Sequence, residues 1–404
     1  MRFGSPYIRC VFLTRFHPII LSVLAGLGAA LAFLMPVVAG AQNQPRPPVS
    51  LDDVPIAMLV DMSSGQVLYA RERGTRFVPA SITKAMTLFL AFELIEQGAL
   101  DPNQSMTMSD ATFREWGGRG STLWINARDT LRVDQLLMGI ANVSANDGSI
   151  LLAQGHAGSV AAWTDAMNEK AAELGMLSSH FGTPNGWPDE GRTFTTAADL
   201  VILGQALVER HRALFDRYVG RPGYTFNGIT QPNRDPLIGQ FRGADGIKTG
   251  YTNESGFGYL GTAQRADQRL VMVVAGIERG RSRAVAARDL MEWGFSAFDR
   301  QRLFSAGETI DQASVQGGAA RSVGLTARQA IWVNVPTGSV QQPRLTIDYN
   351  GPLRAPIAKG EQIATLQIDV DGMEPARIPL YADDNIGEAG LLDRIFNAII
   401  GWLS

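Results

Sequence analysis

The pattern of apolar and polar positions predicts both helices and strands along most of the chain. Two short apolar runs, 56–62 and 67–69, flank a Ser-Ser-Gly turn and predict a β-hairpin. Residues 85–100 are apolar on most sides of a helical projection, which predicts a buried helix. Further helices are expected at 133–140, 149–156, 160–174, 197–208 and 281–298, and strands at 256–262 and 269–277.

The pattern changes after the last of these helices. Short strand-like runs separated by Gly and Pro follow one another between about residues 309 and 380, without a helical pattern between them. We therefore expect one mixed α/β domain over 51–300 and a small all-β domain over 301–385. The strands of the second domain are predicted at 322–325, 330–335, 345–349, 362–370 and 376–380.

The N-terminal segment has the features of a targeting sequence. Three arginines, Arg2, Arg9 and Arg15, precede an apolar run over about 18–38, which ends in the small residues 39–41. This order predicts a secretory signal peptide over 1–41, cut after Ala41, with a Pro- and Gln-rich linker over 42–50. The run is also nearly long enough for an uncleaved membrane anchor. Either alternative places the rest of the chain outside the cytoplasm.

The C-terminal segment, 386–404, predicts an amphipathic helix. Within 391–403, apolar residues recur at spacings of one and four and end in Trp402, while Asp393 and Arg394 lie on the opposite face. Such a helix is too short to span a bilayer but suits the membrane interface. A helix packed on its own domain, or a dimer contact, is the alternative.

Composition excludes several classes of protein. The chain has 404 residues, 45% of them hydrophobic and 19% charged, as in ordinary globular domains, and its net charge of −3 offers no basic face for nucleic acid. The single cysteine, Cys10, lies in the leader, so a disulfide framework, a thiol nucleophile and a Cys-based zinc site are excluded for the body of the protein. Three histidines, His156, His180 and His211, follow the leader without paired spacing, and we expect no metal or organic cofactor.

Lysines are rare and two of them lie in distinctive contexts. Only four of the 36 Lys and Arg residues are lysines, namely Lys84, Lys170, Lys248 and Lys359. An ammonium, unlike a guanidinium, gives up its proton when burial or a nearby cation lowers its pKa. Ser81 and Lys84 are three residues apart at the head of the predicted buried helix, so a neutral Lys84 amine could take the proton of the Ser81 hydroxyl. Ser-x-x-Lys alone is a common pattern, and a helix cap beside a surface lysine is its structural alternative.

Two further motifs follow in order. Lys248 begins a Lys-Thr-Gly triplet that rarely arises by chance and indicates an edge strand, in which Gly250 would let a ligand backbone approach closely. The hydroxyls of Thr249 and Thr252 would face an anion, while Lys248 would lower the pKa of Lys84 and attract a carboxylate. Between the two lies Ser144-Ala145-Asn146, a Ser-x-Asn pattern that by itself indicates a helix cap equally well.

Ser-x-x-Lys, Ser-x-Asn and Lys-Thr-Gly in this order resemble the serine penicillin-recognising enzymes, and most of all the low-molecular-weight penicillin-binding proteins of the D-alanyl-D-alanine carboxypeptidase type. Residues 60–65, 79–87, 136–148, 185–188, 245–252 and 355–360 also resemble stretches of that family, so the resemblance covers about residue 51 to the C-terminus. It implies a mixed α/β catalytic domain with an antiparallel sheet flanked by helices, followed by a small all-β domain.

The resemblance also implies roles. Ser81 would be the acylated nucleophile, Lys84 its general base, and Ser144 a proton relay toward the leaving group. Asn146 would bind the substrate amide, and Lys248 would set the electrostatics. The backbone N–H groups of Ser81 and Tyr251 would form the oxyanion hole, and Thr249 and Thr252 would bind the terminal carboxylate of the substrate.

The implied activity is removal of the terminal D-alanine from peptidoglycan stem peptides through an acyl-enzyme, with β-lactams as covalent inhibitors, at the periplasmic face of the inner membrane. A class A β-lactamase is disfavoured because residues 185–192 lack the Glu-x-x-Leu-Asn pattern that activates deacylating water. A transpeptidase or endopeptidase of the same family, and a non-catalytic peptidoglycan-binding protein, remain as alternatives. A Gly-x-Ser-x-Gly elbow is absent from the sequence.

Overall fold

The computed structural model describes residues 10–11, 45–340 and 342–390. The chain forms two compact units: an N-terminal unit of residues 46–62 and 67–297, and a C-terminal unit built mainly from residues 298 onward, with 63–66. Apart from residues 10–11, the predicted signal peptide lies outside the described residues, as does the predicted amphipathic helix beyond residue 390. In the part of the chain that the structure describes, the helices are too short or too polar to cross a membrane.

An antiparallel sheet forms the centre of the N-terminal unit. Its five strands lie in the order β3-β2-β10-β9-β8, so β8, which carries Lys248, is an edge strand as its sequence predicted. Antiparallel pairing joins β2 to β10, β10 to β9 and β9 to β8. The strands are β2 (Ile56–Asp61), β3 (Gln66–Arg71), β8 (Ala244–Thr252), β9 (Gly256–Arg265) and β10 (Gln268–Ile277).

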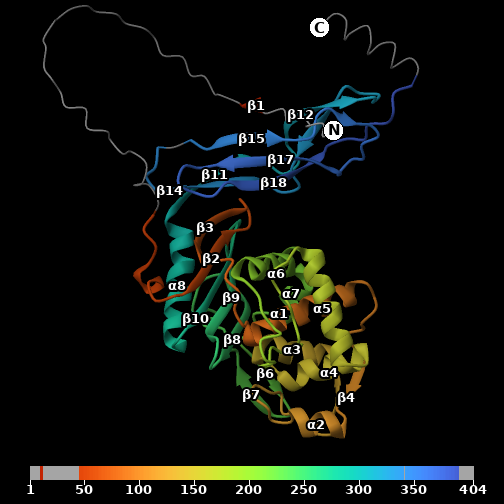
Figure 1. Ribbon diagram of the computed structural model, residues 1–404, viewed down its shortest axis with the longest axis vertical. Helices are drawn as coiled ribbons and strands as arrows, with labels where there is room; N and C mark the ends of the chain where they lie inside the picture. The colour runs from red at the N-terminus through yellow and green to blue at the C-terminus, as the bar shows by residue number, and fades with distance from the viewer. Residues whose placement is uncertain (1–9, 12–44, 341, 391–404) are drawn as a thin grey trace, which may run out of the picture. The chain divides into compact units, whose positions relative to one another are not determined.

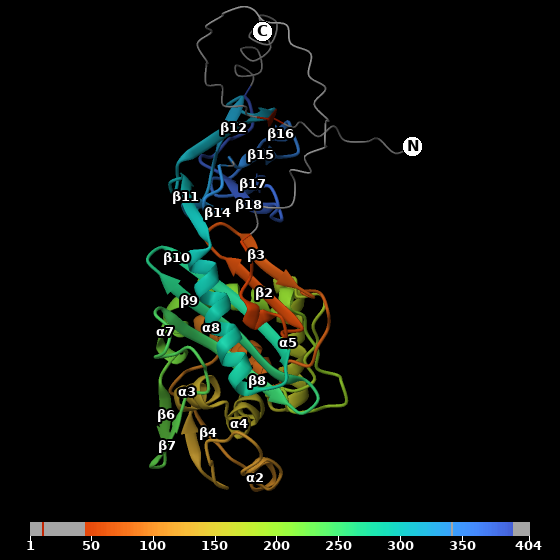
Figure 2. The same ribbon diagram turned by 90° about the vertical axis from the view of Figure 1, so that its left-hand side faces the viewer.

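Helices cover both faces of this sheet, α8 on one face and the other α-helices on the opposite one (Figures 1 and 2). Two glycines allow the close approach. A Cβ at Gly294 of α8 would lie 2.5 Å from a methyl group of Leu59, and one at Gly204 of α6 would lie 3.1 Å from Val271. Because both faces are buried, the strands are continuously apolar instead of alternating.

The helices of this unit follow the predicted pattern closely. The N-terminus of α6 is capped by Thr196, whose hydroxyl accepts the N–H of Asp199. The helices are η1 (Val49–Leu51), η2 (Ala80–Thr83), α1 (Lys84–Glu96), α2 (Asp110–Trp116), α3 (Val133–Val143), α4 (Asn146–Ala157), α5 (Val160–Leu174), α6 (Ala197–Arg210), α7 (Arg212–Tyr218) and α8 (Gly280–Ser296). Two small two-stranded sheets complete the unit, β4 (Ser105–Thr107) with β5 (Thr130–Arg132) and β6 (Gly223–Phe226) with β7 (Ile229–Pro232).

The C-terminal unit is all β with a core of its own. Leu325, Val333, Leu366, Ile368 and Leu380 are buried in this core. One sheet has the order β1-β15-β17-β18-β13-β12-β16, and β11 pairs with β14 in a second. The strands are β1 (Cys10–Val11), β11 (Phe298–Phe304), β12 (Thr309–Gln316), β13 (Ser322–Thr326), β14 (Ile331–Pro336), β15 (Arg344–Asp348), β16 (Leu353–Arg354), β17 (Gln362–Asp369) and β18 (Ala376–Ala382).

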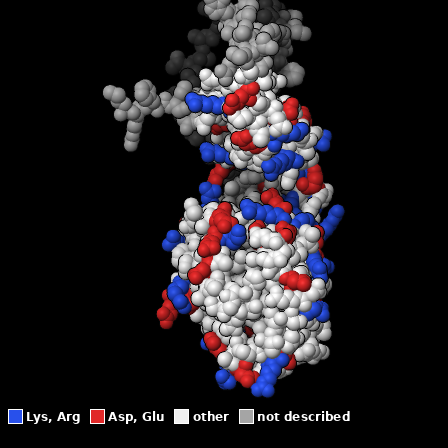
Figure 3. All heavy atoms as spheres, turned by 90° about the vertical axis from the view of Figure 1, so that its right-hand side faces the viewer, with Lys and Arg blue, Asp and Glu red and all other residues white. Residues whose placement is uncertain are grey.

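The fold is therefore the expected mixed α/β class, an antiparallel sheet flanked by helices together with a small β unit. The sequence pattern missed the short or exposed elements α2, α7, β4, β5, β6, β7, β12 and β16. It also missed β11, whose run Phe-Asp-Arg-Gln-Arg-Leu-Phe is too polar to stand out. On the face drawn in Figure 3, acidic and basic side chains are interspersed and neither sign forms a continuous field.

Candidate active site

Ser81 lies on a 3-10 turn that leads directly into helix α1. The turn η2 places Ser81 one turn before Lys84, and the Lys84 Nζ is 2.9 Å from the Ser81 Oγ. Ala80, which precedes the serine, has a φ of 50°, a left-handed conformation that non-glycine residues seldom adopt. The sequence placed Ser81 at the head of the helix itself; the structure places it on the preceding turn, which brings the two side chains to the same side.

The Lys84 amine is completely buried and has three acceptors. Besides Ser81, it lies 2.8 Å from the Oδ1 of Asn146 and 2.6 Å from the backbone oxygen of Asn185. Burial lowers the pKa of Lys84 well below its usual value, and the nearby charge of Lys248 lowers it further, while Asp147 opposes the shift. Burial and the charge of Lys248 therefore favour the neutral amine, the form that accepts a proton.

The Asn185 carbonyl is brought to Lys84 by a segment that packs along α1. One turn after Lys84, the Thr87 hydroxyl donates to the carbonyl of Pro184 at 2.6 Å. Gly186 follows with a φ of 70°, and a Cβ there would lie 1.8 Å from the carbonyl oxygen of Ala80. Only glycine fits at this approach, so residues 184–186 fix an acceptor for the amine and support the turn that carries Ser81.

Ser144 and Asn146 enter the site from the junction between α3 and α4. Ser144 is the left-handed residue that ends α3, with a φ of 65°, and Asn146 begins α4. The side-chain amide of Asn146 links two partners, since its Oδ1 accepts from Lys84 and its Nδ2 donates to the carbonyl of Arg119 at 3.0 Å. A substrate carbonyl would use the second hydrogen of the same Nδ2.

Asp147, the next residue, holds this junction in place. Its buried carboxylate accepts the backbone N–H groups of Leu123 at 3.0 Å, Ile125 at 3.3 Å and Gly148 at 2.8 Å, and the hydroxyl of Thr122. A carboxylate with several donors is well compensated for burial. It therefore ties residues 122–125 to the start of α4.

Lys248 approaches from the edge strand β8. Its amine is 97% buried and donates to the carbonyl of Thr249 at 3.1 Å. Burial lowers the pKa of Lys248 to about 7, with smaller contributions from the positive charges of Arg234 and Arg283. Because burial disfavours the ammonium, an anion bound beside Lys248 would favour its charged form.

Gly250 lines the pocket, as expected for a residue that a ligand backbone would approach, and it also packs against the turn that carries Ser81. A Cβ at Gly250 would lie 2.4 Å from the carbonyl oxygen of Pro79 and 3.1 Å from the Cγ1 of Ile82. The glycine is therefore needed for the close packing of β8 against the turn that carries Ser81.

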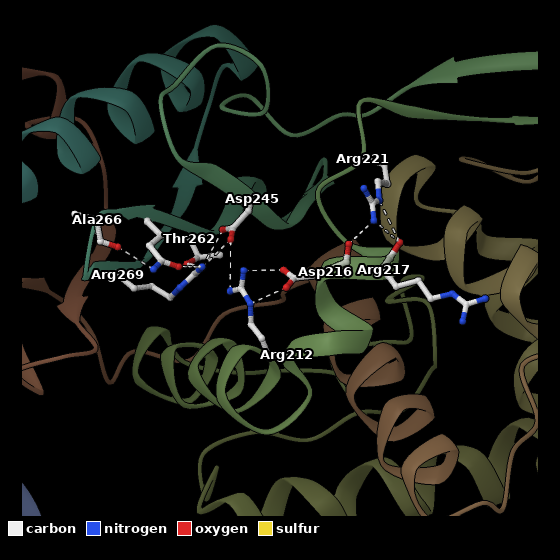
Figure 4. Close-up of polar contacts among 9 residues, drawn as sticks. Arg212, Asp216, Arg217, Arg221, Asp245, Thr262, Ala266 and Arg269 are labelled. Carbon is white, nitrogen blue, oxygen red and sulfur yellow. Dashed lines mark hydrogen bonds and ion pairs between the residues drawn. The ribbon is translucent and has the colours of Figure 1, made fainter. Parts of the chain in front are cut away.

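The start of β8 is held by an ion-pair network (Figure 4). Asp245, three residues before Lys248, accepts from the Arg269 guanidinium of β10 at 3.0 Å and lies 3.8 Å from Arg212 of α7. Arg269 also donates to the hydroxyl of Thr262 at 3.1 Å, and Arg212 pairs with Asp216 at 2.7 Å. Burial raises the pKa of Asp245, and Arg269 opposes this. The network fixes the register of the strand that presents Lys248.

A pocket of about 700 Å³ opens over these groups. Of the predicted site residues, it is lined by Ser81, Ser144, Asn146, Thr249, Gly250, Tyr251 and Thr252. Lys84 and Lys248 are buried behind this surface. The structure thus brings the hydroxyl and the two amines, remote along the chain, to one site.

Several residues of the site were missed by the sequence reasoning. Arg234 and Arg283 line the pocket and supply positive charge beside Lys248. Both are single arginines among 32 and have no motif around them, so only the fold identifies them. Asn185 and Trp187, by contrast, lie in a stretch whose resemblance to the family had been noted without a role.

Comparison with known proteins agrees with this geometry. A family model described as D-alanyl-D-alanine carboxypeptidase, peptidase S11, matches residues 45–278, which is more than half of the chain. The chain belongs to this family of serine-type D-alanyl-D-alanine carboxypeptidases. The resemblance drawn from the motifs is thereby confirmed for the family. A second model, for the C-terminal domain of penicillin-binding protein 5, matches residues 298–388.

Individual relatives span both units of the enzyme. The D-alanyl-D-alanine carboxypeptidase DacA of Haemophilus influenzae is 28% identical over 348 residues, 85% of this chain and 88% of the relative. The crystal structure of penicillin-binding protein 5 from the same organism has a TM-score of 0.72 at 28% identity and covers 83% of this chain and 98% of its own. Penicillin-binding protein D2 of Listeria monocytogenes, solved in an ampicillin-bound form, has a TM-score of 0.55 at 27% identity over 60% of this chain and 98% of its own.

Proposed function

We propose that the enzyme removes the terminal D-alanine of peptidoglycan stem peptides through an ester on Ser81. The observation that carries this proposal is the contact between the Ser81 hydroxyl and a fully buried lysine amine whose pKa is lowered. A serine hydroxyl is a weak nucleophile until a base takes its proton, and a neutral amine at 2.9 Å is placed to do so.

The reaction then proceeds in two steps. The Ser81 Oγ attacks the carbonyl carbon of the penultimate D-alanine, and the hydroxyl proton passes to Lys84. The C–N bond then breaks as Lys84 returns this proton, by way of Ser144, to the amine of the leaving D-alanine. An acyl ester remains on Ser81 and Lys84 is neutral again. Water then hydrolyses this ester, releasing the shortened peptide and restoring the serine.

The opposite side of the pocket suits the carboxylate of the leaving residue. Lys248, Arg234 and Arg283 place positive charge there, and the hydroxyls of Thr249 and Thr252 line the same wall. A bound carboxylate would favour the charged form of Lys248. Charge recognition at this end explains why a peptide with a free C-terminus would be the substrate.

A β-lactam would acylate the same serine. The Listeria relative was solved with ampicillin bound, and its similarity covers 60% of this chain. We propose that penicillin acylates Ser81 and leaves slowly, because residues 185–192 supply no carboxylate in the pattern that β-lactamases use to activate water.

We also propose that the enzyme acts in the periplasm at the outer face of the cytoplasmic membrane. Support comes from the sequence of the leader and from the amphipathic pattern of 391–403. A variant that ends at residue 389 is expected to leave the membrane fraction; sedimentation unchanged from that of the full chain would contradict the C-terminal attachment.

The decisive experiment measures D-alanine release from a diacyl-Lys-D-Ala-D-Ala peptide. Ser81→Ala is expected to abolish both this release and covalent labelling by a fluorescent penicillin, while Ser305→Ala, an exposed serine of the C-terminal unit, should retain both. Labelling without D-alanine release in the wild type would favour a transpeptidase or endopeptidase. Release retained by Ser81→Ala would exclude this serine as the nucleophile.

A further inference from the structure

An arginine is held over two indole rings, one of which, Trp187, lines the pocket. The guanidinium carbon of Arg119 lies 5.2 Å from the ring centre of Trp116 and 4.8 Å from that of Trp187. The two indoles meet edge to face at 5.8 Å, and Trp187 lines the pocket. Contacts of this kind attract a cation to an aromatic face and hold its planar group in one place.

The backbone of the same residue is fastened to the catalytic groups. The carbonyl of Arg119 accepts from the Nδ2 of Asn146 at 3.0 Å, and the N–H of Asn146 donates to the carbonyl of Ser121 at 2.8 Å. Gly120 lies between these two bonds, and a Cβ there would come within 2.8 Å of Asn146 and 2.9 Å of Trp187. The position of the guanidinium is therefore fixed relative to Asn146, and through it to Lys84.

Within the described residues, the Arg119 guanidinium contacts two aromatic rings but no carboxylate. Over residues 45–340 and 342–390 no ion pair joins Arg119 to an acidic side chain, although Arg128 and Arg132 nearby each bind an aspartate. The side chain is also exposed. An ordered guanidinium with free donors is suited to bind a carboxylate through two parallel hydrogen bonds.

The layout of the pocket indicates which part of a ligand reaches it. The scissile carbonyl must lie at Ser81, and the terminal carboxylate faces the cations and hydroxyls of the β8 side. The remaining wall, with Gly120, Ser121 and Trp187, is left for the residues that precede the scissile bond. A side chain lying against Trp187 would bring its end group to Arg119.

We propose that Arg119 selects stem peptides that carry a free carboxylate on the N-terminal side of the D-Ala-D-Ala pair. This inference rests on the proposed function and adds a determinant of substrate specificity to it. Two groups of the stem peptide could supply this carboxylate. One is the distal carboxylate of a diamino acid at the third position, and the other is the α-carboxylate of a γ-linked glutamate at the second position. Arg119 acts by binding and takes no part in proton transfer.

The test compares peptides that end in D-Ala-D-Ala and differ only in one carboxylate. Meso-diaminopimelate peptides with a free or amidated side-chain carboxylate test the first source, and peptides with glutamate or isoglutamine at the second position test the second. Because a charge-assisted hydrogen bond contributes about 1.5–3 kcal/mol, removal of the recognised carboxylate should lower kcat/KM by roughly tenfold or more. Arg119→Gln should lower kcat/KM for the free acid by a similar factor and leave that for the amidated peptide within about twofold.

Three controls separate recognition from a structural effect. Arg119→Lys keeps the charge and should retain part of the preference, and Arg114→Gln, an exposed arginine of α2 outside the pocket lining, should retain all of it. Acylation by benzylpenicillin, whose side chain has no carboxylate, should be unchanged in Arg119→Gln. Slower acylation in that variant would instead show that Arg119 merely supports Asn146 and would overturn the assignment.

The outcomes for the two proposals differ. Equal release of D-alanine from free and amidated peptides by the wild type would refute a role of Arg119 in selection, while leaving the carboxypeptidase activity intact. Absence of release from all four peptides would contradict the proposed function itself.

Discussion

The surroundings of Lys84 and Lys248 differ although both amines are buried. Lys84 has three oxygen acceptors, from Ser81, Asn146 and Asn185, whereas Lys248 has the single carbonyl of Thr249. Burial is the largest cause of the lowered pKa in both cases. The second cause differs: for Lys84 it is Lys248, and for Lys248 it is a pair of arginines at the pocket wall.

This difference in surroundings suits Lys84 and Lys248 to different roles, although their side chains are identical. Lys84 lies against the hydroxyl that would be deprotonated in the proposed reaction, among acceptors that orient its amine. Lys248 lies beside cations, so an anion that binds there compensates several charges at once and raises the pKa of the lysine. Lys84 is therefore suited to be a base and Lys248 to be a charge, and each of the predictions below separates these roles.

The largest effect is expected from Lys84→Arg. A guanidinium keeps the positive charge and the donors but does not release its proton at any pH in the working range. If Lys84 is the base, acylation of Ser81 by benzylpenicillin should slow by about a thousandfold, within the usual range for loss of a general base. Stopped-flow or gel-based measurement of the acylation rate tests this.

Lys170 provides the matched control for this change. It forms an exposed ion pair with Glu173 at 2.6 Å and lies outside the pocket lining, so Lys170→Arg should leave the acylation rate within about twofold. A small effect of Lys84→Arg, comparable to that of Lys170→Arg, would show that the charge of Lys84 and not its basicity is used.

A smaller effect is expected from Lys248→Arg. Because the proposed role of Lys248 is electrostatic, an arginine keeps the positive charge and loses only the close packing of the buried amine. We therefore expect kcat/KM for the peptide to fall by about tenfold, mostly through a higher KM. Lys248→Gln, which removes the charge, should lose considerably more. Equal losses in the two variants would mean that the ammonium itself is required, as at Lys84.

The sequence predicted the parts of this site that are carried by motifs. Ser81, Lys84, Ser144, Asn146 and Lys248 were identified because their residue types and order are unusual. The helices and central strands were identified because their apolar patterns are long.

What the sequence left out depends on contacts between distant segments. The backbone oxygen of Asn185 has no sequence signature, and Asp147 acts through hydrogen bonds to residues 122–125 that only the fold brings near. The packing constraint on Gly250 could not be predicted, because the carbonyl of Pro79 that it contacts lies more than 160 residues earlier. The roles proposed for the isolated arginines Arg119, Arg234 and Arg283 depend on neighbouring residues that only the fold brings close to them.

The smallest effect is expected in the pH dependence of kcat/KM, as a shift of its alkaline limb. A lysine loses its charge as pH rises through its pKa, and the proposed reaction needs a neutral Lys84 and a charged Lys248. Activity should therefore rise with pH as Lys84 loses its proton, and it should fall again as Lys248 loses its proton near its pKa of about 7. Arg283→Gln removes a charge that lowers the pKa of Lys248, so this pKa should rise and the alkaline limb of kcat/KM for the free enzyme should move to higher pH. The acid limb should stay in place, because Arg283 is not among the charges that shift Lys84. Peptide hydrolysis measured across the pH range in the wild type and in Arg283→Gln tests this. A shift of the acid limb alone would contradict the assignment of the charged role to Lys248. A lower maximum with both limbs unmoved would mean that Arg283 binds the substrate without changing the pKa of Lys248.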